Sequence, residues 1–216
     1  MTKRMVDDAA EAVLATAKTL LAKNLVEGTA GNVSARMDGG NICITPSSVD
    51  YRDMCLEDLV VLSPTGEVLH GDRAPSSEKL LHLACYDAFG EIGGVIHSHP
   101  VHATMFAVAH RSIPACVDEF TIFVGGDVEV AHYAPSGTAE VGHNAVEKLG
   151  KRGAALLANH GMVAIGKSPS DALHITALVE RSAQIALGAM SLGGIEPLPE
   201  HATRGFAEIY DLLRNS

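Results

Sequence analysis

Two histidines separated by a single residue, His97 and His99, end an apolar run near the middle of the chain. Gly94-Val95-Ile96 before them is typical of a buried strand. Pro100 after them removes a backbone donor and favours the end of the strand there. Because residues i and i+2 of a strand point to the same face, the two imidazoles are expected to project together from a rigid edge. That arrangement can hold a metal ion.

A third histidine, His160, follows a second apolar run at residues 154–158. Two strands that each end in histidine could supply three ligands to one zinc ion and leave a fourth position open for substrate, as in catalytic zinc sites. Three histidines also accept manganese, cobalt, nickel or iron. Taken singly, each motif also fits an ordinary strand edge or loop histidine, so this pattern alone leaves both interpretations open.

An acidic residue that could transfer a proton stands at the start of an expected helix. Ala74-Pro75-Ser76-Ser77-Glu78 precedes an apolar helical face, and Ser76 or Ser77 would be the N-cap. Hydroxyls, free amides and the positive end of the helix dipole make such a start a natural anion site, although capping alone would also explain the serines. Beside a metal, the Glu78 carboxylate could move a proton on the carbon next to a carbonyl.

Two further loops carry groups that suit a phosphate. Gly28-Thr29-Ala30-Gly31-Asn32 has two glycines three residues apart, which allow close approach of a ligand to the backbone. Thr45-Pro46-Ser47-Ser48 is a hydroxyl-rich turn after an apolar strand. An Asn in an ordinary turn is the alternative explanation for Asn32. With the metal and the carboxylate, these loops favour carbon–carbon bond cleavage next to a ketone on a phosphorylated substrate.

Composition narrows the class of protein. The chain has 216 residues, of which 47% are apolar and 19% charged, and we expect one α/β domain over 1–216. A net charge of −10 argues against nucleic acid and anionic membranes as partners. No run reaches the length of a membrane span, and the first residues lack a signal peptide. The four scattered cysteines are typical of a reducing compartment, so the expected location is the cytoplasm.

Hydrophobic periodicity predicts the elements that position these residues. Helices are expected over 6–23, 77–88, 102–109, 137–149 and 168–190, and strands over 33–36, 41–45, 59–63, 67–70, 94–99, 128–131, 154–158 and 162–165. Residues 113–124 are expected to be irregular or strand-like, and the tail over 200–216 to form a helix or a mobile lid. Tight hairpin turns imply a largely antiparallel or mixed sheet with helices packed around it.

Six motifs occur in one order along residues 10–189, and together the sequence resembles the zinc-dependent class II aldolase/adducin family, most closely its fuculose-phosphate aldolase branch. The motifs are Gly28-Thr29-Ala30-Gly31-Asn32-Val33-Ser34, Ile44-Thr45-Pro46, Pro75-Ser76-Ser77-Glu78, His97-Ser98-His99, Ser112-Ile113-Pro114-Ala115 and Asn159-His160-Gly161. Each motif is weak alone, but six in register are strong evidence.

The resemblance implies a role for each motif residue. His97, His99 and His160 would bind zinc, and Glu78 would be the catalytic acid/base. The substrate phosphate would be held by Asn32, Ser47, Ser48, Ser76 and Ser77. The implied fold is an α/β/α sandwich around a mainly antiparallel sheet, and the implied assembly is a homotetramer with active sites at subunit interfaces. The implied reaction is reversible cleavage of a ketose 1-phosphate to dihydroxyacetone phosphate and an aldehyde.

Two positions depart from the fuculose-phosphate aldolase pattern. Asp118 stands where that branch carries a tyrosine that donates a proton to the leaving oxygen, and Ser136 replaces an aromatic residue before Gly137-Thr138. Both lie on the side that the resemblance assigns to the aldehyde fragment. The proton donor therefore stays open among Asp118, Tyr133 and Tyr210.

Three other functions fit the same scaffold. The enolate chemistry would also serve a decarboxylase of a β-keto acid, such as an oxo-tetronate phosphate or an aromatic acid. A sugar-phosphate epimerase or dehydratase is another alternative, although the family's epimerases carry Asp where this chain has Glu78. A non-catalytic, adducin-like binding module is the last, and the presence of all three histidines argues against it.

Overall fold

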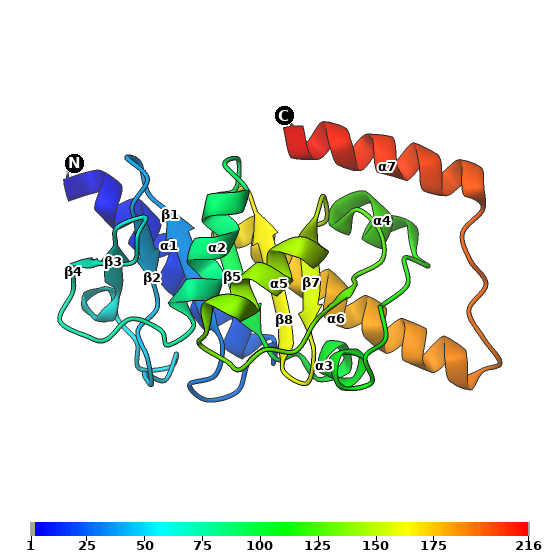
Figure 1. Cartoon of the computed structure of the whole chain (residues 1–216), viewed down its shortest axis with the longest axis horizontal. Helices are drawn as coiled ribbons and strands as arrows, with labels where there is room; N and C mark the ends of the chain where they lie inside the picture. The colour runs from blue at the N-terminus through cyan, green and yellow to red at the C-terminus, as the bar shows by residue number, and fades with distance from the viewer. Residues whose placement is uncertain (1–2, 216) are drawn as a thin grey trace.

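The computed structural model describes residues 3–215, and its centre is one eight-stranded sheet in the order β4-β3-β2-β1-β5-β8-β7-β6 (Figure 1). All neighbouring strands pair antiparallel except β6 and β7, which are parallel. The prediction of a mainly antiparallel sheet is confirmed. The strands are β1 (Asn32–Arg36), β2 (Ile42–Ile44), β3 (Val60–Leu62), β4 (Val68–His70), β5 (Gly94–Ser98), β6 (Val130–Ala131), β7 (Ala154–Leu157) and β8 (Gly161–Gly166).

Helices cover both faces of the sheet, which gives the expected three-layer α/β/α arrangement (Figure 1). One face carries α2 and α5, and the other carries α1, α3, α4 and α6. The helices are α1 (Lys3–Ala22), α2 (Lys79–Ala88), α3 (Val101–Val108), α4 (Asp118–Val124), α5 (Ala139–Leu149), α6 (Pro169–Ser191) and α7 (Glu200–Asn215), with a 3₁₀ turn η1 at Leu56–Asp58.

The central strands are apolar on both sides because both of their faces are covered. In β8, Val163 packs with the helices α2 and α5, whereas Met162 packs with the helices of the opposite layer. In β5, Val95 faces α2 and α5, and Ile96 faces α1. Since side chains alternate along a strand, His97 lies on the same face as Val95, toward α2.

Residues 118–124 form helix α4, so the prediction of an irregular or strand-like segment is wrong there. Asp118 and Glu119 occupy the first turn, Phe120 and Val124 are buried one helical turn apart, and Gly125 ends the helix in the left-handed conformation at φ 90°. The run Phe120-Thr121-Ile122-Phe123-Val124 is rich in residues that favour strands. Tertiary packing of Phe120 and Val124 outweighs that preference.

Helix α2 begins at Lys79, two residues later than the predicted start at residue 77. Its N-cap position is Glu78, without a side-chain capping bond, so the expectation that Ser76 or Ser77 caps the helix is wrong. The Ser76 hydroxyl instead accepts a hydrogen bond from the backbone N–H of Glu78 at 3.2 Å. This places the Glu78 side chain at the helix entrance rather than along its surface.

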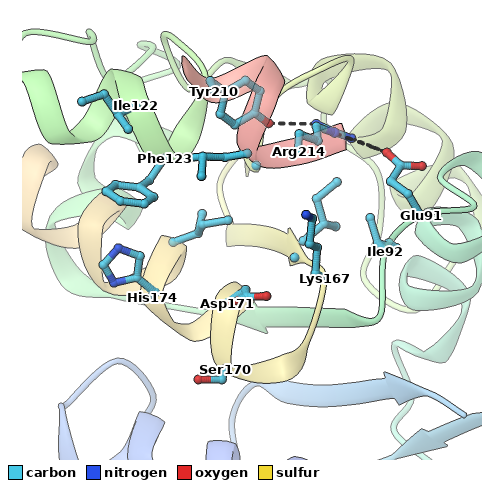
Figure 2. A pocket seen from close by; sticks show the side chains of 15 residues that line it. Glu91, Ile92, Ile122, Phe123, Lys167, Ser170, Asp171, His174, Tyr210 and Arg214 are labelled. Carbon is cyan, nitrogen blue, oxygen red and sulfur yellow. Dashed lines mark hydrogen bonds and ion pairs between the residues drawn. The ribbon is translucent and has the colours of Figure 1, made fainter. Parts of the chain in front are cut away.

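The C-terminal segment forms α7, which lies against α4 after an extended connection from α6 (Figure 1). A cavity of about 490 Å³ lies beneath α7, lined by residues that include Ile165, Gly166 and Tyr210 (Figure 2). Ile165 and Gly166 are at the end of β8 opposite His160. The cavity is therefore remote from the histidines of the same chain. None of the described helices is both long and apolar enough to cross a membrane.

Candidate active site

The three predicted metal ligands meet where β5 ends and β8 begins. These strands pair antiparallel, with Ser98 opposite Met162, so His99 and His160 flank the same edge. The potential ligand atoms of His97, His99 and His160 all lie within 4.8 Å of one another. Their ring centroids are 4.6 to 5.0 Å apart. Sequence spacing placed two of these rings together, and the antiparallel pairing adds the third.

The chemistry of this cluster fits a divalent metal. His97 Nδ1 donates to the Met162 carbonyl at 2.9 Å, which leaves the Nε2 lone pair facing the other two rings. That Nε2 atom is buried without a hydrogen-bond partner among the described residues. An orphaned buried nitrogen is costly unless something absent from the protein chain binds it. Neutral imidazoles that converge in this way are typical zinc ligands.

The His99 and His160 rings are held neutral. Burial, followed by the neighbouring His97 and His160 rings, lowers the pKa of His99 to about 4. Burial and His97 also lower the pKa of His160. Neutral rings keep their lone pairs at physiological pH, which metal binding requires.

Backbone contacts fix the turn that delivers His160. Asn159 adopts φ 56°, and its side-chain oxygen lies 2.6 Å from Nε2 of His110. The Asn159 N–H donates to the Ala107 carbonyl at the end of α3. Gly161 completes the turn because a Cβ there would lie 2.5 Å from the Ser98 carbonyl oxygen and 2.7 Å from His99 Cδ2.

A Gly161→Ala substitution is therefore expected to displace the His99 ring and weaken metal binding by about 10- to 100-fold, the range seen when partners outside the ligand set are lost. Titration of the metal-free variant with zinc in competition with a chelator measures the change. Gly188→Ala, where a Cβ would meet nothing within 4 Å, is the matched control. Unchanged affinity in Gly161→Ala would contradict the crowding argument.

Glu78 approaches the histidines with both carboxylate oxygens. Oε2 lies 3.1 Å from Nε2 of His97, at ion-pair distance but without hydrogen-bond alignment, and Oε1 lies 3.4 Å from Nε2 of His160. Asn32 Nδ2 donates to Oε2 at 3.0 Å, and Ser136 Oγ donates to Oε1 at 2.8 Å. The carboxylate is thus clamped between two donors at the edge of the cluster.

The surroundings of Glu78 favour its ionised form. Burial by itself would raise the pKa of this carboxyl group. The contact with the adjacent His97 ring and the hydrogen bonds from Ser136 and Asn32 outweigh burial and hold the pKa well below its usual range. An ionised carboxylate in this place can accept a proton or contact a metal.

The predicted phosphate-binding loops lie beside Glu78. An isolated bridge joins Pro46 to Pro75 and brings the two serine-containing turns together. Ser47 Oγ donates to the Pro75 carbonyl at 3.2 Å and accepts from the Ser77 N–H at 3.1 Å. Ser48 is exposed and has φ 60°. Asn32 differs from the rest of this set, because its side-chain amide is engaged with Glu78.

Sequence reasoning noticed Ser136 only as a departure from a pattern, whereas the structure brings it into contact with Glu78. In the sequence, the sign of a close backbone approach was Gly137, the residue after Ser136. In the structure Gly137 has φ 79°, and a Cβ there would lie 3.1 Å from the Ser77 carbonyl oxygen. Asp118 and Tyr133 are exposed, Tyr133 by 62%. Among the described residues, no hydrogen bond or ion pair joins either of them to Glu78 or the three histidines.

Tyr210, the third candidate donor, lies on α7 and is 7% exposed. Its phenol donates to the Lys151 carbonyl at 2.6 Å, at the cavity shown in Figure 2. β8 has six residues, so its two ends are about 17 Å apart. Within one chain, Tyr210 is therefore not brought to the histidines, and a donor role would require the site of a neighbouring subunit.

The Tyr210 hydroxyl also accepts a hydrogen bond from Arg214 Nη1 at 2.8 Å. For Tyr210→Phe we expect turnover within about twofold of the wild type and a free energy of unfolding lower by about 2 kcal/mol, because two hydrogen bonds with a net worth of about 1 kcal/mol each are lost. Steady-state kinetics and urea unfolding measure the two quantities. A large loss of turnover with little change in unfolding would instead place Tyr210 in a neighbouring subunit's site.

The sequence and the fold both resemble those of known proteins. The family model described as the Class II Aldolase and Adducin N-terminal domain matches residues 11–187. A 5-deoxy-D-ribulose 1-phosphate aldolase of Bacillus thuringiensis serovar kurstaki is 33% identical over 93% of this chain and 94% of its own. A 5-methylthioribulose-1-phosphate/5-deoxyribulose-1-phosphate aldolase of Rhodospirillum rubrum is 34% identical over 85% and 82%. A solved L-fuculose 1-phosphate aldolase has a TM-score of 0.90 and 34% identity, covering 94% and 96%.

Proposed function

We propose that this chain, which belongs to the class II aldolase and adducin family and is one of its enzymes, reversibly cleaves a ketose 1-phosphate to dihydroxyacetone phosphate and an aldehyde. The observation that carries the proposal is the position of Glu78, whose two oxygens lie 3.1 and 3.4 Å from nitrogens of the three-histidine cluster. A carboxylate that is clamped beside a candidate metal site suits proton transfer next to a polarised carbonyl.

The residues then have separate tasks. His97, His99 and His160 would hold a divalent metal, for which we propose zinc, and that ion would polarise the substrate ketone. Glu78 would protonate the carbon left after bond cleavage and would remove that proton in the synthetic direction. Its ionised resting form suits the second task, and the bonds from Asn32 and Ser136 keep the carboxylate oriented.

The phosphate would bind in the joined serine turns. Ser47, Ser48, Ser76 and Ser77 supply hydroxyls and backbone N–H groups next to Glu78, close to the entrance of α2. We include Asn32 in this set because its amide has a second N–H beside the one bonded to Glu78, and that N–H would donate to the phosphate. The acidic surface does not oppose this, since local amides and hydroxyls can hold a phosphate.

We propose that the part of the site facing the aldehyde fragment accepts a group different from that of fuculose 1-phosphate. Ser136, a small hydroxyl side chain, contacts Glu78 at the position where the fuculose-phosphate aldolase pattern has an aromatic residue. The named relatives that act on 5-deoxyribulose 1-phosphate support a panel that includes 5-deoxy sugars. Asp118 and Tyr133 stay candidate donors to the leaving oxygen, and Tyr210 is a candidate only for the site of a neighbouring subunit.

We further propose that residues 1–216 act as one domain in a cytoplasmic homotetramer. Helix α3 supports the assembly, because Val101, Met105 and Val108 form an exposed apolar stripe, each at least 46% exposed, directly after His99. Large exposed apolar side chains in a row favour a protein interface. An interface there would place a neighbouring subunit next to the histidines.

The deciding experiment is cleavage of a panel of ketose 1-phosphates, including fuculose and 5-deoxyribulose 1-phosphates, by the purified protein with and without chelator. Chelator-sensitive release of dihydroxyacetone phosphate from any member is the expected result. If metal is bound and nothing is cleaved, the aldolase proposal fails. Release of carbon dioxide from β-keto acids would then support the decarboxylase.

A further inference from the structure

A buried chain of polar side chains runs from Glu78 into the layer between β1 and α2. Asn32 and Ser34 are two residues apart on β1 and face α2, whereas His82 and Tyr86 are four residues apart on α2 and face β1. All four are at most 5% exposed. His82 Nε2 lies 2.5 Å from Asn32 Oδ1, and Ser34 Oγ lies 2.6 Å from His82 Nδ1 and 2.9 Å from the Tyr86 hydroxyl.

The direction of every hydrogen bond in this polar network follows from the contact between Asn32 and Glu78. Asn32 Nδ2 donates to Glu78 Oε2, so the Oδ1 atom of the same amide faces His82. Since Oδ1 only accepts, His82 Nε2 must carry the proton. A neutral ring has one N–H, so Nδ1 accepts from the Ser34 hydroxyl, and the Tyr86 hydroxyl donates to Ser34. All four protons point toward Glu78.

The His82 ring is neutral. Burial lowers the pKa of His82 to about 3. A ring that could take up a second proton would leave the orientation of Ser34 and Tyr86 undetermined. A neutral ring with one tautomer makes the chain directional and satisfies each member, which a buried polar network must do to be tolerated.

We propose that His82 is a positioning residue, which locks the Asn32 amide with its NH₂ toward Glu78, and that Ser34 and Tyr86 fix the tautomer that does so. Without this lock the amide can rotate by half a turn and present Oδ1 to the carboxylate, which would push Glu78 away from its place beside His97. The catalytic consequence rests on the proposed acid/base role of Glu78. The positional consequence does not.

Two amide substitutions test the lock as a matched pair. His82→Gln keeps an N–H donor near the position of Nε2, whereas the amide of His82→Asn is one methylene shorter and cannot reach Asn32. We expect the Gln variant to exchange the C3 proton of dihydroxyacetone phosphate within about threefold of wild type. For the same exchange reaction, we expect the Asn variant to lose about tenfold or more in kcat with little change in KM. The reason is that small misplacements of a catalytic group act on the chemical step.

Equal kcat values in the two variants, whether both normal or both reduced, would overturn the proposal, because the lock requires the longer side chain. Metal content and thermal unfolding are measured alongside. Should the Asn variant fail to fold, Ser34→Ala removes the donor that selects the tautomer, and a kcat equal to wild type there would also overturn the lock.

Crystal structures of the metal-loaded variants separate this inference from the proposed function. A Glu78 carboxylate displaced from Asn32 in His82→Asn and in place in His82→Gln supports the lock even if the wild-type protein cleaves no ketose phosphate. An undisplaced Glu78 in both variants overturns it, whatever the activity.

Discussion

Replacing Glu78 by Gln is expected to slow exchange of the C3 proton of dihydroxyacetone phosphate by about 10²- to 10⁴-fold, the usual contribution of a positioned acid or base. The substitution keeps the shape of the side chain and removes its ability to accept a proton. Because the three histidines are untouched, metal content should stay near one ion per chain. Proton exchange with deuterated water, followed by NMR, measures the rate without needing the aldehyde partner.

A matched variant isolates the carboxylate from its clamp. Ser136→Ala removes the donor to Oε1 but leaves the Asn32 bond to Oε2 in place. Its loss should be far smaller than that of Glu78→Gln, since the carboxylate and one of its two donors remain. Full exchange in Glu78→Gln, with metal bound, would remove Glu78 from the proton-transfer step.

Local patterns were sufficient to predict the pieces of the candidate site. His97 and His99 fall on one face because a strand repeats every two residues, and the apolar runs on both sides of His160 predicted two strands that the structure contains. The pairing of β8 with β5 is a different kind of information. It depends on packing between residues that are far apart in the sequence, such as His97 and Met162, which are separated by 65 positions.

The contacts around Glu78 could not be predicted by the same reasoning. Ser136 is 58 residues from Glu78 in sequence, and its hydroxyl reaches the carboxylate only through the tight approach at Gly137. His82 lies on an apolar helix face, where a single histidine is most often a core residue. Its meaning comes from Asn32 and Ser34 on the facing strand, which the order β1-β5-β8 places next to His97.

Removing one histidine of the cluster should have the largest effect on the protein as a whole. We expect His99→Ala to weaken metal binding by more than about 100-fold, beyond the effect of losing an outer partner, and to lower turnover to background. Without His99, a metal bound to the otherwise unpartnered Nε2 of His97 would have only His160 as a second histidine ligand. Metal analysis after dialysis measures the loss, and His143→Ala, an exposed histidine on α5, is the control.

The same variant links the metal to stability. A ligand that binds only the folded protein stabilises it by about 2.7 kcal/mol at a concentration 100 times its Kd. Chelation should therefore lower the thermal midpoint of the wild type and of His143→Ala, and should leave that of His99→Ala unchanged, because this variant has no metal to lose. A midpoint that responds equally in all three proteins would show that the stabilising ion binds elsewhere, and the three-histidine assignment would then be wrong.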